Sequence, residues 1–183
     1  MLNQRQNNVQ SPTLCATAQI FLESESSAFI VFVIKKTVQH RSAYYIFIFQ
    51  VYLPCVKYSN DVYSEFISKL YDLYCIYSER GTPIFMGDFN ADVTGLKGRK
   101  DCNLRVVNTL NLSYGSLYTY VSYDDICYST IDHMCIPVKI CDLVVHCEGA
   151  DNICLNMTRH KPILCCLIIH CTYILYRIWW CAC

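Results

Sequence analysis

The stretch that most constrains the fold of this chain runs over residues 83–92 and reads PIFMGDFNAD. Ile84 to Met86 has the apolar side chains of a short buried strand, and polar side chains follow it at Asp88 and Asn90. Side chains two residues apart on an extended chain point to the same face, so both are expected to project from the carboxyl end of one strand. Open α/β sheets usually bind ligands at that end. A carboxylate there can hold a water, a metal ion or a proton, and a carboxamide can donate to a phosphate oxygen.

The composition is that of one apolar domain without a strong charge. With 183 residues, the chain is long enough for one domain with a sizeable core. Hydrophobic residues make up 54% and charged residues 16%, which is more apolar than is usual for a soluble domain. Basic and acidic residues balance at 15 each, so no overall basic field favours nucleic-acid binding, and any contact with a polyanion has to be local.

The fourteen cysteines bear on the redox compartment. The first residues of the chain are polar and rich in Asn and Gln, so they do not resemble a secretory signal peptide. The spacings give no paired CxxC motif, and the Cys- and His-containing segment after residue 164 matches no zinc template. We therefore expect reduced, mostly buried thiols in an intracellular protein of the nucleus or cytoplasm.

Strand and helix patterns alternate along the chain after a disordered lead-in expected over residues 1–17. The runs expected as strands are Ala18–Leu22, Ala28–Ile34, Ala43–Val51, Ile84–Met86, Leu117–Val121, Thr130–Pro137, Leu143–His146 and Pro162–His170. The runs expected as helices are Asp61–Tyr77 and Cys102–Leu112. A polar turn joins the second and third strand runs, which predicts an antiparallel hairpin. This order of elements predicts an α/β domain with mixed sheets.

Four short segments occur in an order that is informative beyond secondary structure. They are residues 51–54 (VYLP), 87–92 (GDFNAD), 118–133 with YTYVS at one end and TIDH at the other, and 155–163 (LNMTRHKPI). In this order they resemble the endonuclease/exonuclease/phosphatase superfamily, which has the DNase I-like fold. They are most similar to the endonuclease domains of non-LTR retrotransposons. The resemblance spans roughly residues 28–169, which is most of the chain.

This resemblance implies a fold, a reaction and a partner. The fold would be a two-sheet α/β sandwich, N-terminally truncated, over residues 18–171, with residues 172–183 as a hydrophobic tail outside the family. The reaction would be Mg²⁺-dependent hydrolysis of DNA phosphodiester bonds. DNA is therefore the expected partner, Mg²⁺ is the expected metal, and no small-molecule cofactor is expected. The resemblance leaves the oligomeric state open.

The resemblance also assigns roles to individual side chains. His160 matches the histidine that polarises the phosphate or transfers a proton, and Asp132 matches the carboxylate that orients its ring. Asp88 matches the residue that positions or activates the nucleophile. The remaining members of the expected catalytic set are an amide that holds the phosphate, a phenol that reaches it and a hydroxyl beside the site: Asn90, Tyr52 and Thr119.

Two departures from the family pattern predict weak or absent activity. The family's last motif is usually Ser-Asp-His, and here Arg159 stands in place of the carboxylate. A cation beside the imidazole is expected to lower the pKa of His160 and to repel Mg²⁺. The family also opens with an Asn-bearing strand and a strand that ends in a metal-binding Glu. Glu23 is the only candidate for that ligand, and its spacer to the next strand is too short.

Three alternatives stay open. The first is a catalytically inactive domain, vestigial or binding-only, and the second is a phosphodiesterase of the same superfamily that acts on a lipid or a nucleotide. The third is a membrane-anchored protein, because residues 163–183 are apolar over a length that can span a bilayer. We expect instead a strand over Ile163–Ile169 and a poorly packed end over Tyr173–Cys183, so a membrane partner is not expected.

Overall fold

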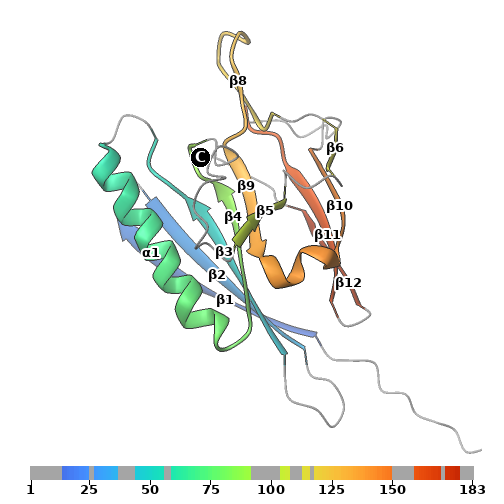
Figure 1. The fold of residues 1–183 in the computed structure, drawn as a ribbon. Helices are drawn as coiled ribbons and strands as arrows, with labels where there is room; N and C mark the ends of the chain where they lie inside the picture. Colours follow the sequence, from blue (N-terminus) through green and yellow to red (C-terminus); the bar gives the residue numbers. More distant parts are fainter. Residues whose placement is uncertain are drawn as a thin grey trace, which may run out of the picture.

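The structure is a computed structural model that describes residues 14–24, 27–36, 44–55, 59–91, 104–107, 113–115, 118–149, 159–169 and 172–177. These residues form two main sheets, a long helix and a small hairpin (Figure 1). The six-stranded sheet has the spatial order β1 (Leu14–Ser24), β2 (Ser27–Lys36), β3 (Tyr44–Tyr52), β4 (Thr82–Asp88), β9 (Asp132–Pro137) and β5 (Leu104–Val106). The four-stranded sheet has the order β12 (Thr172–Arg177), β11 (Ile163–Ile169), β10 (Val144–Gly149) and β6 (Ser113–Gly115). The hairpin is β7 (Tyr120–Val121) and β8 (Tyr128–Ser129), and a 3₁₀ helix (Val138–Leu143) joins β9 to β10.

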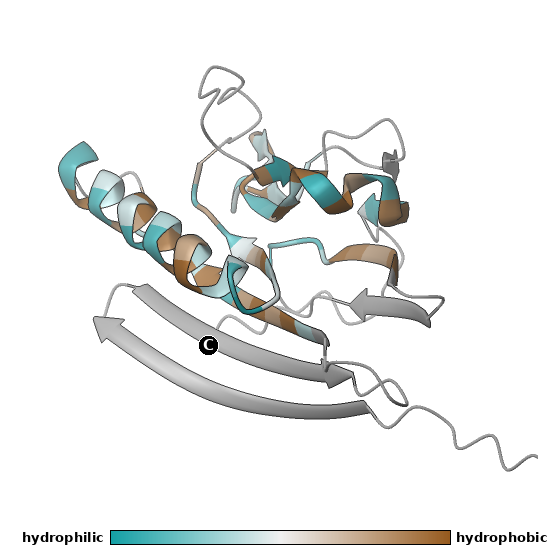
Figure 2. Cartoon of the chain, turned by 60° about the horizontal axis from the view of Figure 1, so that its bottom comes forward, coloured by the Kyte–Doolittle hydropathy of each residue, from teal (hydrophilic) through white to brown (hydrophobic). Residues whose placement is uncertain are grey.

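Helix α1 (Asn60–Ser78) joins two parallel strands, β3 and β4. Its start is fixed by Ser59, whose hydroxyl accepts a hydrogen bond from the backbone N–H of Val62 (3.4 Å). Its buried residues Phe66 and Leu70 are four residues apart and therefore lie on one side of the helix. Figure 2 shows hydrophilic and hydrophobic segments alternating along α1, which is typical of a helix that covers a sheet.

The turn from α1 into β4 requires glycine at position 81. An ideal Cβ atom on Gly81 would lie 2.3 Å from the backbone oxygen of Tyr45 and 2.9 Å from the ring of Phe47. Non-bonded atoms do not approach so closely, so the turn can lie against β3 only because this residue has no side chain. This contact helps to fix where β4 enters the sheet.

The central strands β3, β4 and β9 contribute to a different core on each face, because alternate side chains point to opposite sides of a sheet. We call the first core the inter-sheet cluster, since it contains residues of both main sheets, among them Ile48, Ile84, Met134, Val144 and Leu167. We call the second the helix-side cluster, and it includes Phe49, Phe85, Cys135, Phe66 and Leu70. A polar residue at a strand end on the first face therefore lies at the rim of the space between the sheets.

Most of the expected strands are present, with bounds that differ from the expected ones by a few residues. The antiparallel hairpin of β2 and β3 and the strand β11 are confirmed. The first strand starts at Leu14, inside the segment expected to be a disordered lead-in. The structure therefore extends the six-stranded sheet further toward the start of the chain than the sequence pattern indicates.

The helix expected over residues 102–112 is wrong where the structure describes this segment. Leu104–Val106 forms β5 instead, an edge strand that pairs with β9 in antiparallel register. Leu104 and Val106 pack against the helix-side cluster, and Arg105 between them is exposed. This alternation is the period of a strand, and pairing with β9 overrides the helical spacing of the leucines.

The apolar end of the chain also differs from the expectation. Residues 173–177, part of the end over Tyr173–Cys183 that was expected to pack poorly, belong to β12, which pairs along β11 from Leu164↔Arg177 to Ile169↔Thr172; residues 178–183 lie outside the described residues. Pairing with β11 satisfies backbone groups that a loose end would leave to water. Among the residues that the structure describes, no helix combines the length and the apolar character needed to cross a bilayer.

Candidate active site

Three adjacent strand ends bring polar side chains into one row. Tyr52 of β3 is paired with Asp88 of β4, and Asp88 is paired with Asp132 of β9. Paired residues on neighbouring strands point to the same face, which here is the face of the inter-sheet cluster. The carboxyl-bearing residues are 4% and 2% exposed, whereas Tyr52 at the end of the row is 45% exposed. The row therefore runs from a buried carboxylate pair to a phenol at the surface.

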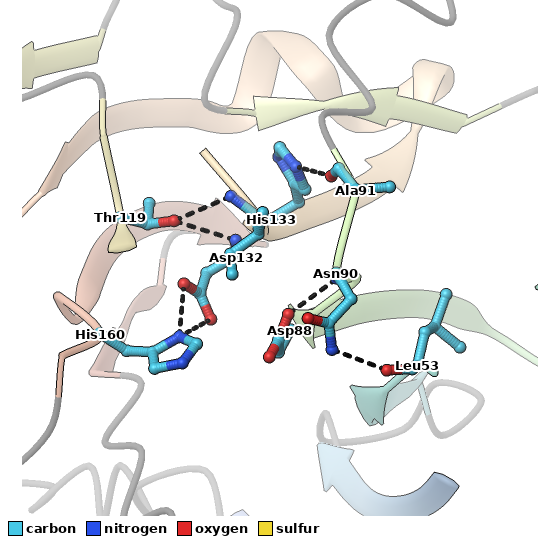
Figure 3. Close-up of polar contacts among 9 residues, drawn as sticks. Leu53, Asp88, Asn90, Ala91, Thr119, Asp132, His133 and His160 are labelled. Carbon is cyan, nitrogen blue, oxygen red and sulfur yellow. Dashed lines mark hydrogen bonds and ion pairs between the residues drawn. The ribbon is translucent and has the colours of Figure 1, made fainter. Parts of the chain in front are cut away.

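His160 reaches this row from the segment that leads into β11. Its backbone is held by an isolated bridge to Tyr120, flanked by Val121 N–H donating to Arg159 O (3.0 Å) and Lys161 N–H donating to Thr119 O (2.6 Å). The imidazole Nδ1 lies 3.0 and 3.2 Å from the two carboxylate oxygens of Asp132 (Figure 3). An ionised carboxylate only accepts hydrogen bonds, so Nδ1 carries the proton in this pair. This is the contact expected of an orienting carboxylate.

Asp88, Asp132 and His160 form one compact group. Each offers a ligand atom, and these atoms lie within 4.8 Å of one another. One oxygen of Asp88 also accepts the backbone N–H of Asn90 (2.7 Å), which fixes the carboxylate at the end of β4. The structure thus brings together three of the predicted site residues from β4, β9 and the segment before β11.

Thr119 is hydrogen-bonded to the backbone that carries Asp132. Its Oγ1 accepts the backbone N–H groups of Ile131 (3.1 Å) and Asp132 (2.9 Å). The side chain is buried, and it is bonded to the backbone at the start of β9. Thr119 therefore holds the residue that carries the orienting carboxylate, as Figure 3 shows.

The side chain of Asn90, expected to hold a phosphate, makes a hydrogen bond within the protein. Its Nδ2 donates to the backbone oxygen of Leu53 (2.7 Å), which ties the turn after β4 to the segment after β3. Its backbone has a φ of 48°, in the left-handed region that Asn tolerates better than most residues. A carboxamide has two N–H donors, so this bond uses half of its donor capacity.

Glu23, the expected metal ligand, belongs to the outer strand β1. The row of paired residues runs Leu22, Ala28, Tyr52 and Asp88, so β2 and β3 lie between Glu23 and the carboxylate pair. At about 4.8 Å per strand, three spacings separate the two backbones by about 14 Å. The assignment of Glu23 to the metal site stays a prediction.

Arg159, expected to lower the pKa of His160, points away from the imidazole. Its guanidinium forms an ion pair with Asp125 through Nη1, and Nη2 donates to the backbone oxygen of Tyr123 (3.2 Å). Neighbouring residues in an extended segment point to opposite sides, so Arg159 faces the turn of the β7–β8 hairpin while His160 faces Asp132. The cation therefore does not lower the pKa of the imidazole as expected.

The pKa of His160 is raised above its ordinary value. Burial alone lowers it, but the hydrogen bond to Asp132 and the negative charges of Asp132 and Asp88 outweigh burial. At neutral pH a larger share of the imidazole is therefore protonated than in an unperturbed histidine. Such a ring can stabilise negative charge on a phosphate or donate a proton to it.

The pKa of Asp88 is raised to about 6. Burial is the largest cause, the charge of Asp132 adds to it, and the hydrogen bond from Asn90 and the charge of His160 offset part of it. A carboxylate with this pKa can take a proton from a water near neutral pH. The two titratable groups are thereby suited to opposite roles, one as acid and one as base.

The donor set fits a divalent cation. Two buried carboxyl groups side by side repel each other when ionised, and a bound cation would relieve this repulsion. Carboxylate oxygens are the ligands that Mg²⁺ prefers in proteins. Asp88 and Asp132 are the residues that would hold it, with the imidazole of His160 beside them.

Sequence patterns missed the residues that brace this group. His133, next to Asp132 on β9, points to the other face of the sheet, and its Nε2 lies 2.9 Å from the backbone oxygen of Ala91. The ring of Tyr120 lies 5.0 Å from the ring of His160, centroid to centroid. The direction of His133 could have been predicted from strand alternation, because the residue next to a site residue on a strand points to the opposite face. The position of the Tyr120 ring depends on the bridge between Tyr120 and His160, for which the sequence gives no signal.

Comparison with known proteins identifies the fold. No family model matches the chain, and no curated protein matches it either. Among solved structures, TDP2 from D. rerio complexed with a single-strand DNA product aligns over 84% of this chain and 67% of its own, with a TM-score of 0.58 and 13% identity. A conserved protein of unknown function from Enterococcus faecalis aligns over 81% and 63% (TM-score 0.56, 15% identity). An endonuclease/exonuclease/phosphatase from Bacteroides vulgatus aligns over 82% and 63% (TM-score 0.55, 13% identity).

These likenesses show a shared fold and a difference in length. The chain has the mixed α/β fold of endonuclease/exonuclease/phosphatase structures over about four fifths of its residues. It spans about two thirds of the length of the solved structures that it matches.

Proposed function

We propose that this chain is a phosphodiesterase domain that cleaves DNA with the help of Mg²⁺, acts weakly, and is related to non-LTR retrotransposon endonucleases. The single observation that carries the proposal is the group formed by Asp88, Asp132 and His160 at the strand ends of a nuclease-type fold. The order of the four sequence segments supports DNA as the substrate and the retrotransposon relationship. We propose an intracellular location on the same grounds.

The residues of the group divide the reaction between them. Asp88, with a pKa of about 6, accepts a proton from the attacking water. His160, held by Asp132, faces the phosphate as a protonated or proton-donating ring. A divalent cation bound by the two carboxylates would supply electrostatic stabilisation of the charge on the phosphoryl oxygens.

Two further residues bind or shape the substrate position in this proposal. Tyr52 is half exposed at the end of the row and offers its hydroxyl to a phosphate oxygen. Asn90 offers its second N–H group while its first holds Leu53 O. We attribute the weakness of the reaction to Glu23, because β2 and β3 separate its strand, β1, from the strand that carries Asp88.

A nicking assay on supercoiled plasmid DNA with Mg²⁺ tests the proposal. His160→Ala should reduce the rate by about 10²–10⁴-fold, and chelation of the metal should abolish nicking. His146→Ala is the matched control, because His146 lies partly exposed on β10, where its Nε2 pairs with Glu148. Equal nicking by the unmodified chain and His160→Ala would refute the assignment.

The same preparations separate the alternatives. Retained DNA binding without nicking by the unmodified chain would favour a binding-only domain. Hydrolysis of a phosphoinositide or a cyclic nucleotide without hydrolysis of DNA would favour another substrate of the same fold.

A further inference from the structure

The turn of the β7–β8 hairpin is a closed, hydrogen-bonded unit. Ser122 N–H donates to Cys127 O (2.9 Å), and Cys127 N–H returns to the hydroxyl of Ser122 (2.9 Å). Ile126 N–H donates to a carboxylate oxygen of Asp124 (3.2 Å). Asp125 sits at the tip with a φ of 58°, in the left-handed region that Asp and Asn adopt more readily than other non-glycine residues. These three hydrogen bonds order the turn within residues 122–127 and do not themselves join it to another element.

Arg159 makes that connection. Its guanidinium pairs with Asp125, donates to the backbone oxygen of Tyr123 and lies over the ring of Tyr123, 5.5 Å from its centroid. A planar guanidinium, with five N–H donors and a flat face, suits these three simultaneous contacts better than an ammonium group does. Three kinds of contact thus converge on one turn from one side chain.

The backbone of the same residue is bonded to the base of the hairpin. Arg159 O accepts the N–H of Val121, and the next residue, His160, is the bridge partner of Tyr120. Arg159 therefore holds the hairpin at two levels, the base through its backbone and the tip through its side chain. His160, the next residue, links the base of the hairpin to the carboxylate pair through its bridge to Tyr120 and its contact with Asp132.

We propose that Arg159 is a positioning residue that fixes the tip of the β7–β8 hairpin relative to His160. The tip carries exposed apolar side chains, Tyr123 and Ile126, at the outer end of a hairpin whose base is bridged to His160. A fixed tip limits how a long polymer can lie across His160, so the effect on substrate binding rests on the proposed function. The anchoring itself does not depend on that function. The basic residue at this position is then a structural support and not a free cation for phosphate.

Hydrogen exchange tests the anchoring without requiring activity. In the full chain, Arg159→Gln and Asp125→Asn should each increase the exchange rates of the hairpin amides at Ile126 and Cys127, roughly two- to fivefold. Asn at position 125 keeps the left-handed backbone, so this variant removes the charge and leaves the turn conformation. The double variant should exchange no faster than Arg159→Gln, because Arg159→Gln alone already removes the ion pair with Asp125. Arg159→Lys should recover part of the protection.

Arg80→Gln is the matched control, because Arg80 also lies over a tyrosine ring, that of Tyr77 at the end of α1 (5.7 Å). It should leave the hairpin amides unchanged. Unchanged exchange in both Arg159→Gln and Asp125→Asn would overturn the proposal.

Steady-state cleavage of a DNA oligonucleotide distinguishes anchoring from direct phosphate binding. Under the proposal, Arg159→Gln and Asp125→Asn both raise KM roughly two- to fivefold and leave kcat within twofold. A phosphate-binding arginine would instead give opposite results, with weaker binding in Arg159→Gln and tighter binding in Asp125→Asn, where the competing carboxylate is gone. That outcome would overturn the proposal. If the unmodified chain cleaves no DNA, the proposed function fails while the exchange measurement still decides the role of Arg159.

Discussion

Asp88 and Asp132 are cross-strand partners on β4 and β9, and both are almost completely buried on the same face of the sheet. A protein interior tolerates two ionised carboxylates side by side only with compensation from protons, hydrogen bonds or a cation. The hydrogen bond from Asn90 and the imidazole of His160 compensate in part, and the raised pKa of Asp88 shows that the compensation is incomplete.

Replacement of Asp88 by Asn should stabilise the protein near neutral pH. The folded pKa of about 6 lies above the ordinary value of 3.8, so the folded state holds the proton more tightly than the unfolded state. The resulting stabilisation is fully present below pH 4 and is lost as pH rises through 6. The free energy of unfolding should therefore fall by about 1–3 kcal/mol over this range in the unmodified protein, and Asp88→Asn should lack this loss. Urea denaturation from pH 4 to pH 7 measures it.

A surface variant provides the comparison for this measurement. Asp72→Asn changes an exposed carboxylate on α1 and should leave the pH profile of the unmodified protein in place. Parallel profiles for the unmodified protein and Asp88→Asn would contradict the assignment of the raised pKa to Asp88.

Removal of the charge of Asp132 should lower the pKa of His160. The hydrogen bond and the charge of Asp132 raise this pKa against the effect of burial, so Asp132→Asn leaves burial dominant. In the unmodified protein, the stability contributed by the pair is present below the ordinary histidine pKa and is lost as pH rises through the folded value. An NMR titration of the imidazole measures the change directly. A His160 titration curve that does not move in Asp132→Asn would show that the pair is not formed.

Replacement of Thr119 by Val should destabilise the protein by about 1–3 kcal/mol, because two backbone N–H groups, one buried and one partly buried, lose their acceptor. Thr119→Ser keeps the hydroxyl and should cost less. Thermal or urea denaturation compares the two variants. A Val variant as stable as the unmodified protein would show that the two hydrogen bonds to the Thr119 hydroxyl contribute little.

Asn90 combines a left-handed backbone with a side-chain bond, and two substitutions separate the contributions. Asn90→Gly loses the bond to Leu53 O and keeps a comfortable backbone, whereas Asn90→Ala loses the bond and strains the backbone. Ala should therefore be less stable than Gly by about 1 kcal/mol. Urea denaturation of both variants measures the difference. The reverse order would show that the turn relaxes out of the left-handed region.

Much of the central fold can be predicted from local patterns. The long apolar runs of β2 and β3, the helical spacing of Phe66 and Leu70 and the strand before Asp88 all agree with their tertiary surroundings. Spacing alone also places Asp88 at a strand end. The order of the four segments adds Asp132 and His160, which lie far away in sequence and which local periodicity cannot join to the site.

What could not be predicted depends on contacts between distant segments. The apolar residues Leu104, Val106 and Val107 have a spacing that suits either a strand or a helix, and pairing of Leu104–Val106 with the edge of β9 decides in favour of the strand. Thr172–Arg177 likewise forms a strand because it pairs with the edge of β11. The direction of Arg159 follows from the bridge between His160 and Tyr120, which turns neighbouring side chains to opposite sides.

Strand β9 has a consequence for how this protein can change by mutation. Asp132 points to the candidate site, and His133, the next residue, points to the opposite face and lies against Phe89 and the backbone oxygen of Ala91. A substitution that repacks the space beneath the helix would shift the strand and carry the carboxylate with it. Selection for the activity at Asp132 therefore also acts on substitutions around His133, although these residues lie on the face of the sheet away from the candidate site. Lineages that lose the activity should accumulate changes around Phe89 and His133 as readily as at Asp132 itself.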